Sequence, residues 1–380
     1  MTVLHRRTDA SSTELFMTFL AEPSLHAYES PRPPSGARMD DYDYDLPFAS
    51  IAQDPIEQRD AARLLVALSA SAAPQHRHIR DLASLLDPGD LLVVNETRVI
   101  PARLHLSKPS GGAVEVLLLE HRSDQSWQAL VKPSRKVAAG TRLRPGPGLI
   151  VEIGEVLQGG QRLVRLLGDD GEPLARGAEE QALETFGEAP LPPYISAPLA
   201  DSSRYQTTYA RVAGSAAAPT AGLHFTPAVF DALSSRGVEV AKVDLAVGLD
   251  TFRPVTVDRP EEHNIHSERY DVPAATWDAV LRTRAAGGRV VAVGTTTVRS
   301  LETVAASGVL SGRTKLLIYG SYPFAVVDIL LTNFHLPRSS LLLLVEAFAG
   351  TRWRDLYAEA IHEGYRFLSL GDAMLLGRDA

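Results

Sequence analysis

Residues 289–302 read Arg-Val-Val-Ala-Val-Gly-Thr-Thr-Thr-Val-Arg-Ser-Leu-Glu. The apolar, β-branched run at the start is typical of a buried strand, and residues 298–306 are expected to form a helix. Gly294 and three threonines connect the two. Such a turn presents backbone N–H groups and hydroxyls at the positive end of the helix dipole, where carboxylates and phosphates bind. The segment therefore predicts an α/β fold with an anion-binding turn at residues 295–297.

The polar residues of this segment also have structural interpretations. Thr295 or Thr296 could cap the helix, although capping accounts for one threonine rather than three. Arg299 and Glu302 are three residues apart, so they share a face of the helix. They could pair with one another or face a ligand, and we favour the ligand.

Strands and helices alternate through most of the remaining chain, which indicates an α/β body. A helix over residues 227–236 is expected to end at Gly237, ahead of a strand over 238–247. Further helices are expected at 274–286, 338–349 and 353–363.

Between about residues 102 and 188 the pattern changes to short β-rich runs separated by Gly and Pro. These runs cover residues 114–119, 127–131, 149–153 and 162–166, and a helix is expected within 172–188. We therefore predict a mixed α/β body with an inserted small antiparallel β-barrel domain. The predicted division is 1–37 as a mobile N-terminal extension, 38–101 with 189–380 as a discontinuous α/β catalytic domain, and 102–188 as the barrel insert. A docking helix around residues 14–20 is the alternative for part of the extension.

The composition limits the chemistry. The chain has 380 residues, no cysteine and a formal net charge of -8. Disulfides, thiolate metal sites, iron–sulfur clusters and cysteine nucleophiles are therefore excluded. The acidic balance argues against broad affinity for nucleic acid, although basic residues gather between Lys132 and Arg144. Because no apolar run reaches the length of a membrane span, we expect no membrane partner and a cytoplasmic location. The oligomeric state is not predicted.

Two further segments carry polar residues in places that core packing does not require. Residues 219–225 read Pro-Thr-Ala-Gly-Leu-His-Phe, and residues 332–337 read Thr-Asn-Phe-His-Leu-Pro. Their histidines, His224 and His335, are candidate proton acceptors, as is His266 farther along; a structural role is the alternative for each. A metal site at His263 and His266 is not favoured by the flanking turn and strand, so no metal is predicted. The chain has no Gly-x-Gly-x-x-Gly, Walker or Gly-x-Ser-x-Gly motif at the positions those folds require.

Taken with five more motifs, these segments resemble the S-adenosylmethionine:tRNA ribosyltransferase-isomerase family, the enzymes that make epoxyqueuosine in tRNA. The further motifs are residues 89–103, 191–195 (Leu-Pro-Pro-Tyr-Ile), 204–207 (Arg-Tyr-Gln-Thr), 266–268 (His-Ser-Glu) and 365–367 (Tyr-Arg-Phe). The resemblance runs from about Arg38 to the C-terminus.

The resemblance implies an enzyme that moves and isomerises the ribosyl part of S-adenosylmethionine. The acceptor is the aminomethyl group of 7-aminomethyl-7-deazaguanine in tRNA, and adenine and methionine are released. S-adenosylmethionine is then a co-substrate, tRNA is a partner and no metal takes part. His224 is the first candidate for the base, followed by His335 and His266. The remaining candidate site residues bind substrate: Thr97, Arg98, Arg103, Thr220, Gly222, Phe225, Thr295, Thr296, Thr297, Arg299, Glu302, Asn333 and Phe334.

Within that set the resemblance implies specific roles. The threonine turn and Arg299 would hold the methionine end, while Thr97, Arg98 and Arg103 would line the site or contact the acceptor. Asn333 and Phe334 would hydrogen-bond to and stack on a purine. The barrel would contact RNA.

The chain departs from the family pattern at three places. Glu96 stands where the family usually has Asn, and Gly320 follows Tyr319 where the family usually has Pro. In residues 246–252 the family's His and second Gly are replaced by Ala246 and Asp250, and Leu249 is bulky. These changes leave two alternatives open. One is a divergent enzyme that uses S-adenosylmethionine with a small-molecule acceptor, and the other is a non-catalytic protein that binds S-adenosylmethionine or RNA.

Overall fold

The computed structural model describes residues 27–33, 35–108, 110–157, 160–248 and 254–378. The helix considered at residues 14–20, most of the predicted extension, and the departures at Leu249 and Asp250 therefore lie outside the described residues.

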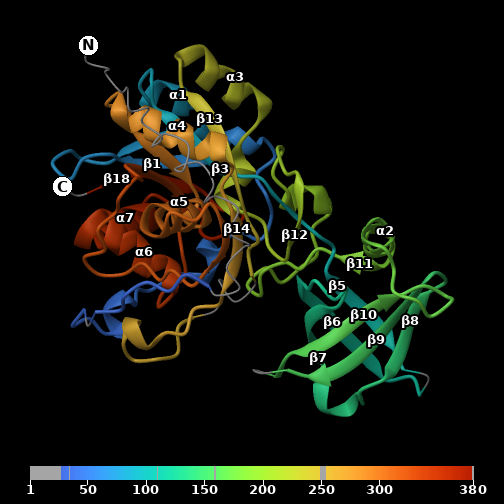
Figure 1. Cartoon of the computed structure of the whole chain (residues 1–380). Coiled ribbons are helices and arrows are strands. Elements are labelled where there is room, and N and C mark those ends of the chain that lie inside the picture. The colour runs from blue at the N-terminus through green and yellow to red at the C-terminus, as the bar shows by residue number, and fades with distance from the viewer. Residues whose placement is uncertain (1–26, 34, 109, 158–159, 249–253, 379–380) are drawn as a thin grey trace, which may run out of the picture.

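The body is built on a large mixed sheet with a parallel centre (Figure 1). In the described part of the chain its order is β16-β14-β13-β3-β15-β17-β18-β1-β2. The central strands β13, β3, β15 and β17 run parallel, whereas β18 is antiparallel to β17. In chain order the strands are β1 Arg63–Ala67, β2 Gln75–His78, β3 Leu91–Asn95, β13 Glu239–Leu245, β14 Glu268–Asp271, β15 Val290–Val293, β16 Ser311–Thr314, β17 Ile329–Asn333 and β18 Ala373–Gly377.

Every residue of β3, β15, β17 and β18 is buried, because helices cover both faces of the sheet. Alternate residues of each strand point to opposite faces and enter two separate cores. Leu92 and Val291 pack with α1 (Leu82–Leu85) and α3 (Pro227–Arg236). Leu91 and Leu330 pack with α4 (Ala274–Ala285), α5 (Thr295–Ser307), α6 (Ser340–Ala349) and α7 (Trp353–His362).

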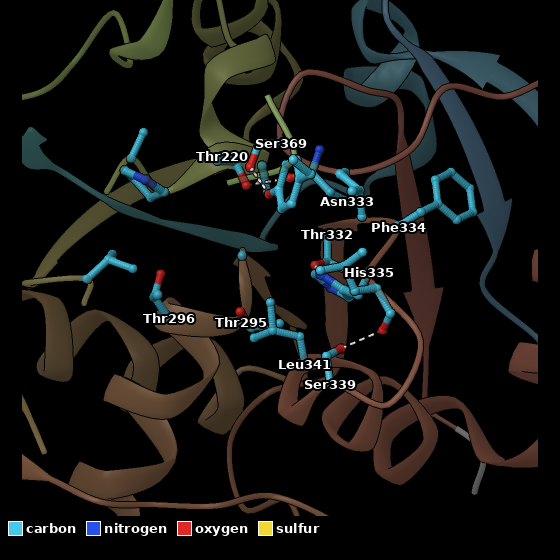
Figure 2. A pocket seen from close by; sticks show the side chains of 18 residues that line it. Thr220, Thr295, Thr296, Thr332, Asn333, Phe334, His335, Ser339, Leu341 and Ser369 are labelled. Carbon is cyan, nitrogen blue, oxygen red and sulfur yellow. Dashed lines mark hydrogen bonds between the residues drawn. The ribbon is translucent and has the colours of Figure 1, made fainter. Parts of the chain in front are cut away.

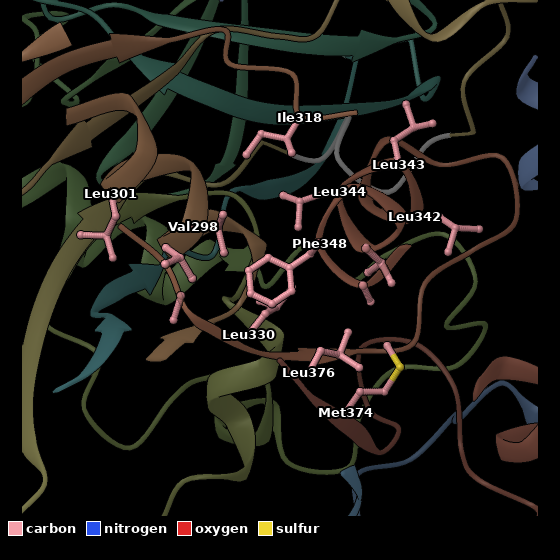
Figure 3. Packing of buried hydrophobic residues seen from close by; sticks show 14 of the residues in the cluster. Val298, Leu301, Ile318, Leu330, Leu342, Leu343, Leu344, Phe348, Met374 and Leu376 are labelled. Carbon is pink, nitrogen blue, oxygen red and sulfur yellow. The ribbon is translucent and has the colours of Figure 1, made fainter. Parts of the chain in front are cut away.

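The core beneath α5 and α6 holds the two helices against the sheet (Figure 3). Val298 and Leu301 of α5, together with Leu344 and Phe348 of α6, meet Leu330 of β17 there. Burying one such side chain contributes roughly 1.5–3 kcal/mol. This packing sets the position of the α5 N-terminus relative to the end of β17, and both of these elements border the site described below.

A second, curled antiparallel sheet lies apart from the large one (Figure 1). Its order among the described residues is β11-β5-β6-β7-β10-β9-β8, and it has its own apolar core, which includes Val116, Val151 and Val164. The mixed α/β architecture is therefore confirmed, and the insert region is an antiparallel sheet. Its elements are β5 Arg103–Ser107, β6 Ala113–His121, β7 Trp127–Lys132, β8 Thr141–Gly146, β9 Leu149–Val156, β10 Arg162–Leu167, α2 Arg176–Phe186 and β11 Gly187–Glu188.

Two short strands join this sheet to the body, together with ion pairs made by Arg98 and Arg313. β4 (Thr97–Val99) pairs in parallel with β12 (Val212–Ser215). Arg98 pairs with Glu180 of α2 at 3.3 Å, and Arg313 of β16 pairs with Glu120 of β6. Within the part of the chain that is described, no helix has the length and apolarity needed to cross a membrane.

Helix α3 begins and ends as the sequence predicts, whereas α5 does not. Thr226 caps α3 by accepting from the backbone N–H of Val229, and Gly237 ends it with φ +82°. The predicted helix at 298–306 instead begins at Thr295. The three threonines therefore belong to its first turn, and Gly294, with φ +86°, is the residue that precedes the helix.

Replacing Gly237 by Ala should lower the free energy of unfolding by about 1 kcal/mol, because the left-handed backbone disfavours a Cβ atom. A Cβ atom at Gly177, in the first turn of α2, would meet no heavy atom within 4 Å, and the backbone there is not left-handed. Gly177→Ala is the matched control and should be neutral or stabilising by up to about 1 kcal/mol. Urea denaturation of both variants checks this, and equal losses of stability would contradict it.

Candidate active-site cleft

A cleft opens at the carboxyl ends of the parallel strands β15 and β17. This edge is where open α/β sheets bind ligands, since the loops after adjacent strands diverge there. In Figure 2, Thr220 and Asn333 lie on one side of the cavity, and Thr295 and Thr296 on the other. The lining residues are Tyr194, Ala218, Pro219, Thr220, Ala221, Val247, Gly294, Thr295, Thr296, Thr332, Asn333, Phe334, His335, Leu336, Ser339, Leu341, Leu368 and Ser369.

The Asn333 side chain, at the end of β17, connects three separate segments around the cleft. Its Oδ1 accepts a hydrogen bond from Thr220 Oγ1 at 2.8 Å. Its Nδ2 donates to the backbone carbonyl of Asp372 at 3.2 Å and faces His224 Nε2 at 3.4 Å. For Nε2 to accept, the proton of the neutral His224 ring must be on Nδ1. Thr220, His224 and Asn333, from two of the predicted motifs, are therefore brought together.

His335 borders the cleft directly. Its Nε2 lies 2.9 Å from Thr332 Oγ1, and its backbone N–H donates to Tyr357 Oη at 3.0 Å. Burial lowers the pKa of His335 to about 3. His224 is also buried; burial first, and then the charges of Arg59 and Arg366, lower its pKa to about 4. Both rings are therefore neutral at pH 7, and a neutral ring nitrogen can accept a hydrogen bond.

The N-terminus of α5 forms the opposite wall. Thr295 and Thr296 line the cleft, whereas Thr297 donates its hydroxyl to the carbonyl of Val293, at the end of β15, at 2.7 Å. Thr296 Oγ1 accepts a hydrogen bond from Asn95 Nδ2 at 3.2 Å. The first-turn N–H groups of this helix have no intrahelical partners, so they provide an anion-binding end.

Arg299 and Glu302 do not face the cleft and are not paired with one another. The buried Arg299 forms an ion pair with Glu268, and its Nε donates to Leu316 O at 3.0 Å. Glu302 accepts from three consecutive backbone N–H groups, those of residues 325, 326 and 327, at 2.8–3.0 Å. Both side chains are occupied in connecting α5 to its neighbours.

Thr97, Arg98 and Arg103 lie where the two sheets join rather than in the cleft. The backbone N–H of Thr97 donates to Asn95 Oδ1 at 3.2 Å, and Arg98 pairs with Glu180. Arg103 is in β5, and its Nε is buried without a hydrogen-bond partner among the described residues.

Three other predicted residues serve packing. A Cβ atom at Gly222 would lie 2.1 Å from Tyr209 Oη, so any other residue there would require the Tyr209 ring to move. Phe225 is buried against Phe230, with ring centroids 5.4 Å apart. The ring of Phe334 stacks on Phe367, with centroids 4.6 Å apart, so it is already covered by an aromatic partner.

His266 lies outside the cleft. It is exposed, and it precedes β14. The pKa of the neighbouring His263 is lowered by burial first, and then by the charges of Arg32 and His266.

The structure accommodates the departures at Glu96, Ala246 and Gly320, which lie among the described residues. Glu96 is buried but forms ion pairs with Arg211 and, at 3.4 Å, with Lys242. Although burial opposes it, hydrogen bonding from Arg211 lowers the pKa of Glu96, so its charge is retained and balanced. Ala246 donates its backbone N–H to Arg269 O at 3.0 Å. Gly320 borders a different cavity, in which Tyr319 and Ser35 also take part.

Sequence reasoning did not single out Asn95, Tyr194 or Ser369. Asn95 also bonds both backbone groups of Leu245, at 3.0 and 3.1 Å. Tyr194 Oη and Ser369 Oγ lie 2.6 Å apart at the edge of the cleft. Asn95 could have been found from the sequence, because it is a polar residue at the end of an otherwise apolar strand. No such signal in the sequence marks Ser369 as a site residue.

Comparisons with known proteins match the family that the sequence motifs resemble, and the matches cover most of the chain. A family model described as "Queuosine biosynthesis protein" matches residues 39–376. The S-adenosylmethionine:tRNA ribosyltransferase-isomerase of Moorella thermoacetica is 51% identical over 346 residues, covering 89% of this chain and 99% of that protein. The protein of the same name from Thermus thermophilus is 50% identical over 352 residues, with the same coverage. The crystal structure of S-adenosylmethionine tRNA ribosyltransferase from Thermotoga maritima matches with a TM-score of 0.51 and 37% identity, covering 88% of this chain and 99% of the other.

Replacing Glu302 by Ala should lower the free energy of unfolding by about 3 kcal/mol or more, because three backbone N–H groups lose their acceptor. Glu302→Gln keeps one acceptor oxygen and should cost roughly half as much. Chemical denaturation measures both. If Glu302→Ala kept its stability and lost ligand binding instead, Glu302 would be a ligand residue.

Acid should destabilise the fold through the two buried histidines. Their folded-state pKa values, about 4 for His224 and about 3 for His335, lie below the value near 6.5 of an unfolded histidine. The unfolded chain therefore binds more protons in acid, so this stability is present above about pH 6.5 and is lost as pH falls toward 4. His335→Asn should flatten the dependence of unfolding free energy on pH by up to about 1.4 kcal/mol per pH unit. An unchanged slope would contradict this.

Proposed function

Since the chain belongs to the queuosine biosynthesis protein family, we propose that it is an S-adenosylmethionine:tRNA ribosyltransferase-isomerase. The enzyme transfers and isomerises the ribosyl moiety of S-adenosylmethionine onto the aminomethyl group of 7-aminomethyl-7-deazaguanine in tRNA, and it releases adenine and methionine. The observation that carries this proposal is the convergence of Thr220, Asn333, His335 and the α5 N-terminus on one cleft. Relatives that bear this name are about half identical over 89% of the chain, which supports it.

The reaction makes four demands on a site. A base must take a proton from C5′, which the adjacent sulfonium acidifies, and adenine must leave with a hydrogen bond to its ring. The methionine carboxylate needs a cation or a helix N-terminus, and water must be excluded. The first turn of α5 at Thr295 and Thr296 suits the carboxylate, because its free N–H groups and its dipole both favour negative charge.

We propose that His335 contacts the reacting atoms and that His224 is a positioning residue. His335 borders the cleft itself, whereas His224 reaches it through Asn333. This reverses the order that the sequence favoured. Both rings are neutral at pH 7, which is the form that accepts a proton. Asn333 keeps Thr220 and His224 in register, and its amide is the candidate hydrogen-bond partner for the leaving purine.

Residues 102–188 are proposed as an inserted small barrel domain that contacts RNA, with 38–101 and 189–380 as the catalytic body. Their separate apolar core and their attachment through β4 and β12 support this division. S-adenosylmethionine is the co-substrate and tRNA the partner. The departures at Glu96 and Gly320 give no specific support for a different acceptor, because the charge of Glu96 is balanced and Gly320 lies outside the cleft.

The direct test is mass spectrometry of free adenine and methionine after incubation with S-adenosylmethionine and tRNA that carries the aminomethyl-deazaguanine. Release of both, with the matching mass gain on the tRNA, is expected. Release with another acceptor only, or no release at all, would contradict the proposal.

In the same assay His335→Ala should lower turnover by about 10²–10⁴-fold, as expected for loss of a general base. His224→Ala should lower it about tenfold, because its effect passes through Asn333. His362→Ala, at an exposed helix end, is the matched control and should not change turnover. Wild-type turnover of His335→Ala would remove His335 from the mechanism, and an equal loss in both variants would give His224 a direct part.

A further inference from the structure

A smaller cavity lies beside the cleft. Ser369 borders both cavities, and His224, which contacts Asn333 of the cleft, borders the smaller one. The smaller cavity is lined by Pro55, Ile56, Arg59, Arg204, Leu223, His224, Ser369 and Leu370. The cleft and the smaller cavity are therefore adjacent, and Ser369 forms part of the wall of both.

Arg59 and Arg204 of this lining are partly buried. Arg59 donates to Leu223 O at 2.8 Å and to Ser203 O at 3.2 Å. Arg204 donates through Nη2 to Ile56 O, while its Nε is buried without a hydrogen-bond partner among the described residues. These bonds to carbonyls hold both guanidinium groups in place, and neither group forms a salt bridge with a carboxylate in the described part of the chain.

A third arginine reaches the same region. Arg366 donates to the backbone carbonyl of Asp54, and its charge acts on His224. Burial first, and then the charge of Arg204, lower the pKa of Arg59, which places two like charges close together.

No carboxylate lies within ion-pair distance of these three arginines in the described part of the chain. The acidic groups that act on them are Asp201 and Asp372. Asp201 is exposed and accepts from Ser203 N at 2.9 Å, and Asp372 accepts from the backbone N–H of Arg63 and Arg366. Arg142, Arg289 and Arg299 differ, since each has a carboxylate partner. The buried Arg162 of β10 is a structural counterpart, because it too bonds only to backbone carbonyls, those of Gly154, Ser134 and Val137.

We propose that the cavity between Arg59, Arg204 and His224 is an oxyanion subsite of the substrate-binding site. The inference rests on the proposed function, because the anion is taken to be part of a substrate. A guanidinium fork binds the two oxygens of a carboxylate or phosphate at once, and gathering several forks without an acid is unfavourable until such a group enters. A tRNA phosphate and the amino-acid carboxylate of S-adenosylmethionine share this chemistry. Since the α5 N-terminus already suits the carboxylate, phosphate is the expected source.

The test measures the Kd of S-adenosylmethionine and the Kd of tRNA separately, each at several salt concentrations, with Arg59→Gln and Arg204→Gln. Arg282→Gln is the matched control, because Arg282 is exposed on α4 and pairs only with Glu239 among described residues. A tRNA Kd at least tenfold weaker, with S-adenosylmethionine binding unchanged, would assign the subsite to phosphate. The slope of log K against log salt should then also become shallower by about 0.7–0.9 for each phosphate that is no longer neutralised.

The opposite pattern, weaker S-adenosylmethionine with unchanged tRNA, would assign the subsite to the carboxylate. An S-adenosylmethionine analogue with a carboxamide in place of the carboxylate should then bind wild type and variants equally. Unchanged binding of both substrates would overturn the proposal.

Lysine variants separate anion binding from a structural role. Arg59→Lys and Arg204→Lys keep the positive charge but lack the fork that bonds Leu223, Ser203 and Ile56. Recovery of most of the affinity that the Gln variants lack would support the subsite. If Lys and Gln variants bound equally weakly and also had lower thermal stability, the arginines would be structural, and the proposal would fail. The experiments on the subsite measure binding constants, whereas the proposed function is tested by the release of adenine. Failure of one proposal can therefore be distinguished from failure of the other.

Discussion

The arrangement of the cleft depends on one buried amide, that of Asn333 at the end of β17. It accepts from Thr220 and donates toward Asp372 O and His224, so three segments distant in sequence meet at a single side chain. A buried amide left with unpaired groups costs about 1–3 kcal/mol for each, and this cost is what holds the segments in register. Asn95 has the corresponding position at the end of β3, where it joins β13 to Thr296 of α5.

The body of the protein neutralises its buried charges within itself. Arg299 pairs with Glu268, Arg289 with Asp90, and Glu96 with Arg211. Glu302 is solvated by backbone N–H groups instead of a cation. Arg59 and Arg204, which lie beside the cleft, form no ion pair with a carboxylate among the described residues, and we propose that a substrate oxyanion binds to them.

The apolar strands and helix caps made most of the body predictable. Thr226, Pro227 and Gly237 set the ends of α3 by local chemistry, so its bounds were predicted as observed. The start of α5 was predicted three residues late, because Thr295–Thr297 resemble a turn until packing on β15 extends the helix. The sequence predicted that Arg299 and Glu302 contact a ligand. Helical periodicity shows that the two residues share a face of the helix, but it does not show which part of the protein packs against that face. Glu268 and the loop at 325–327, distant in sequence, cover that face.

The order of residues along the chain was enough to establish the family resemblance, the α/β alternation and the two loops that carry Thr220, His224, Asn333 and His335, because all of these are local properties. Tertiary structure alone decided which of those residues share a cavity. It placed His335 on the cleft and His224 behind Asn333, and it enclosed Phe334 against Phe367. It also gathered Arg59, Arg204 and Arg366 from three distant segments without an acidic partner among the described residues. Burial and electrostatic contact depend on distances through space, and those distances are set by the packing of the helices on the sheet.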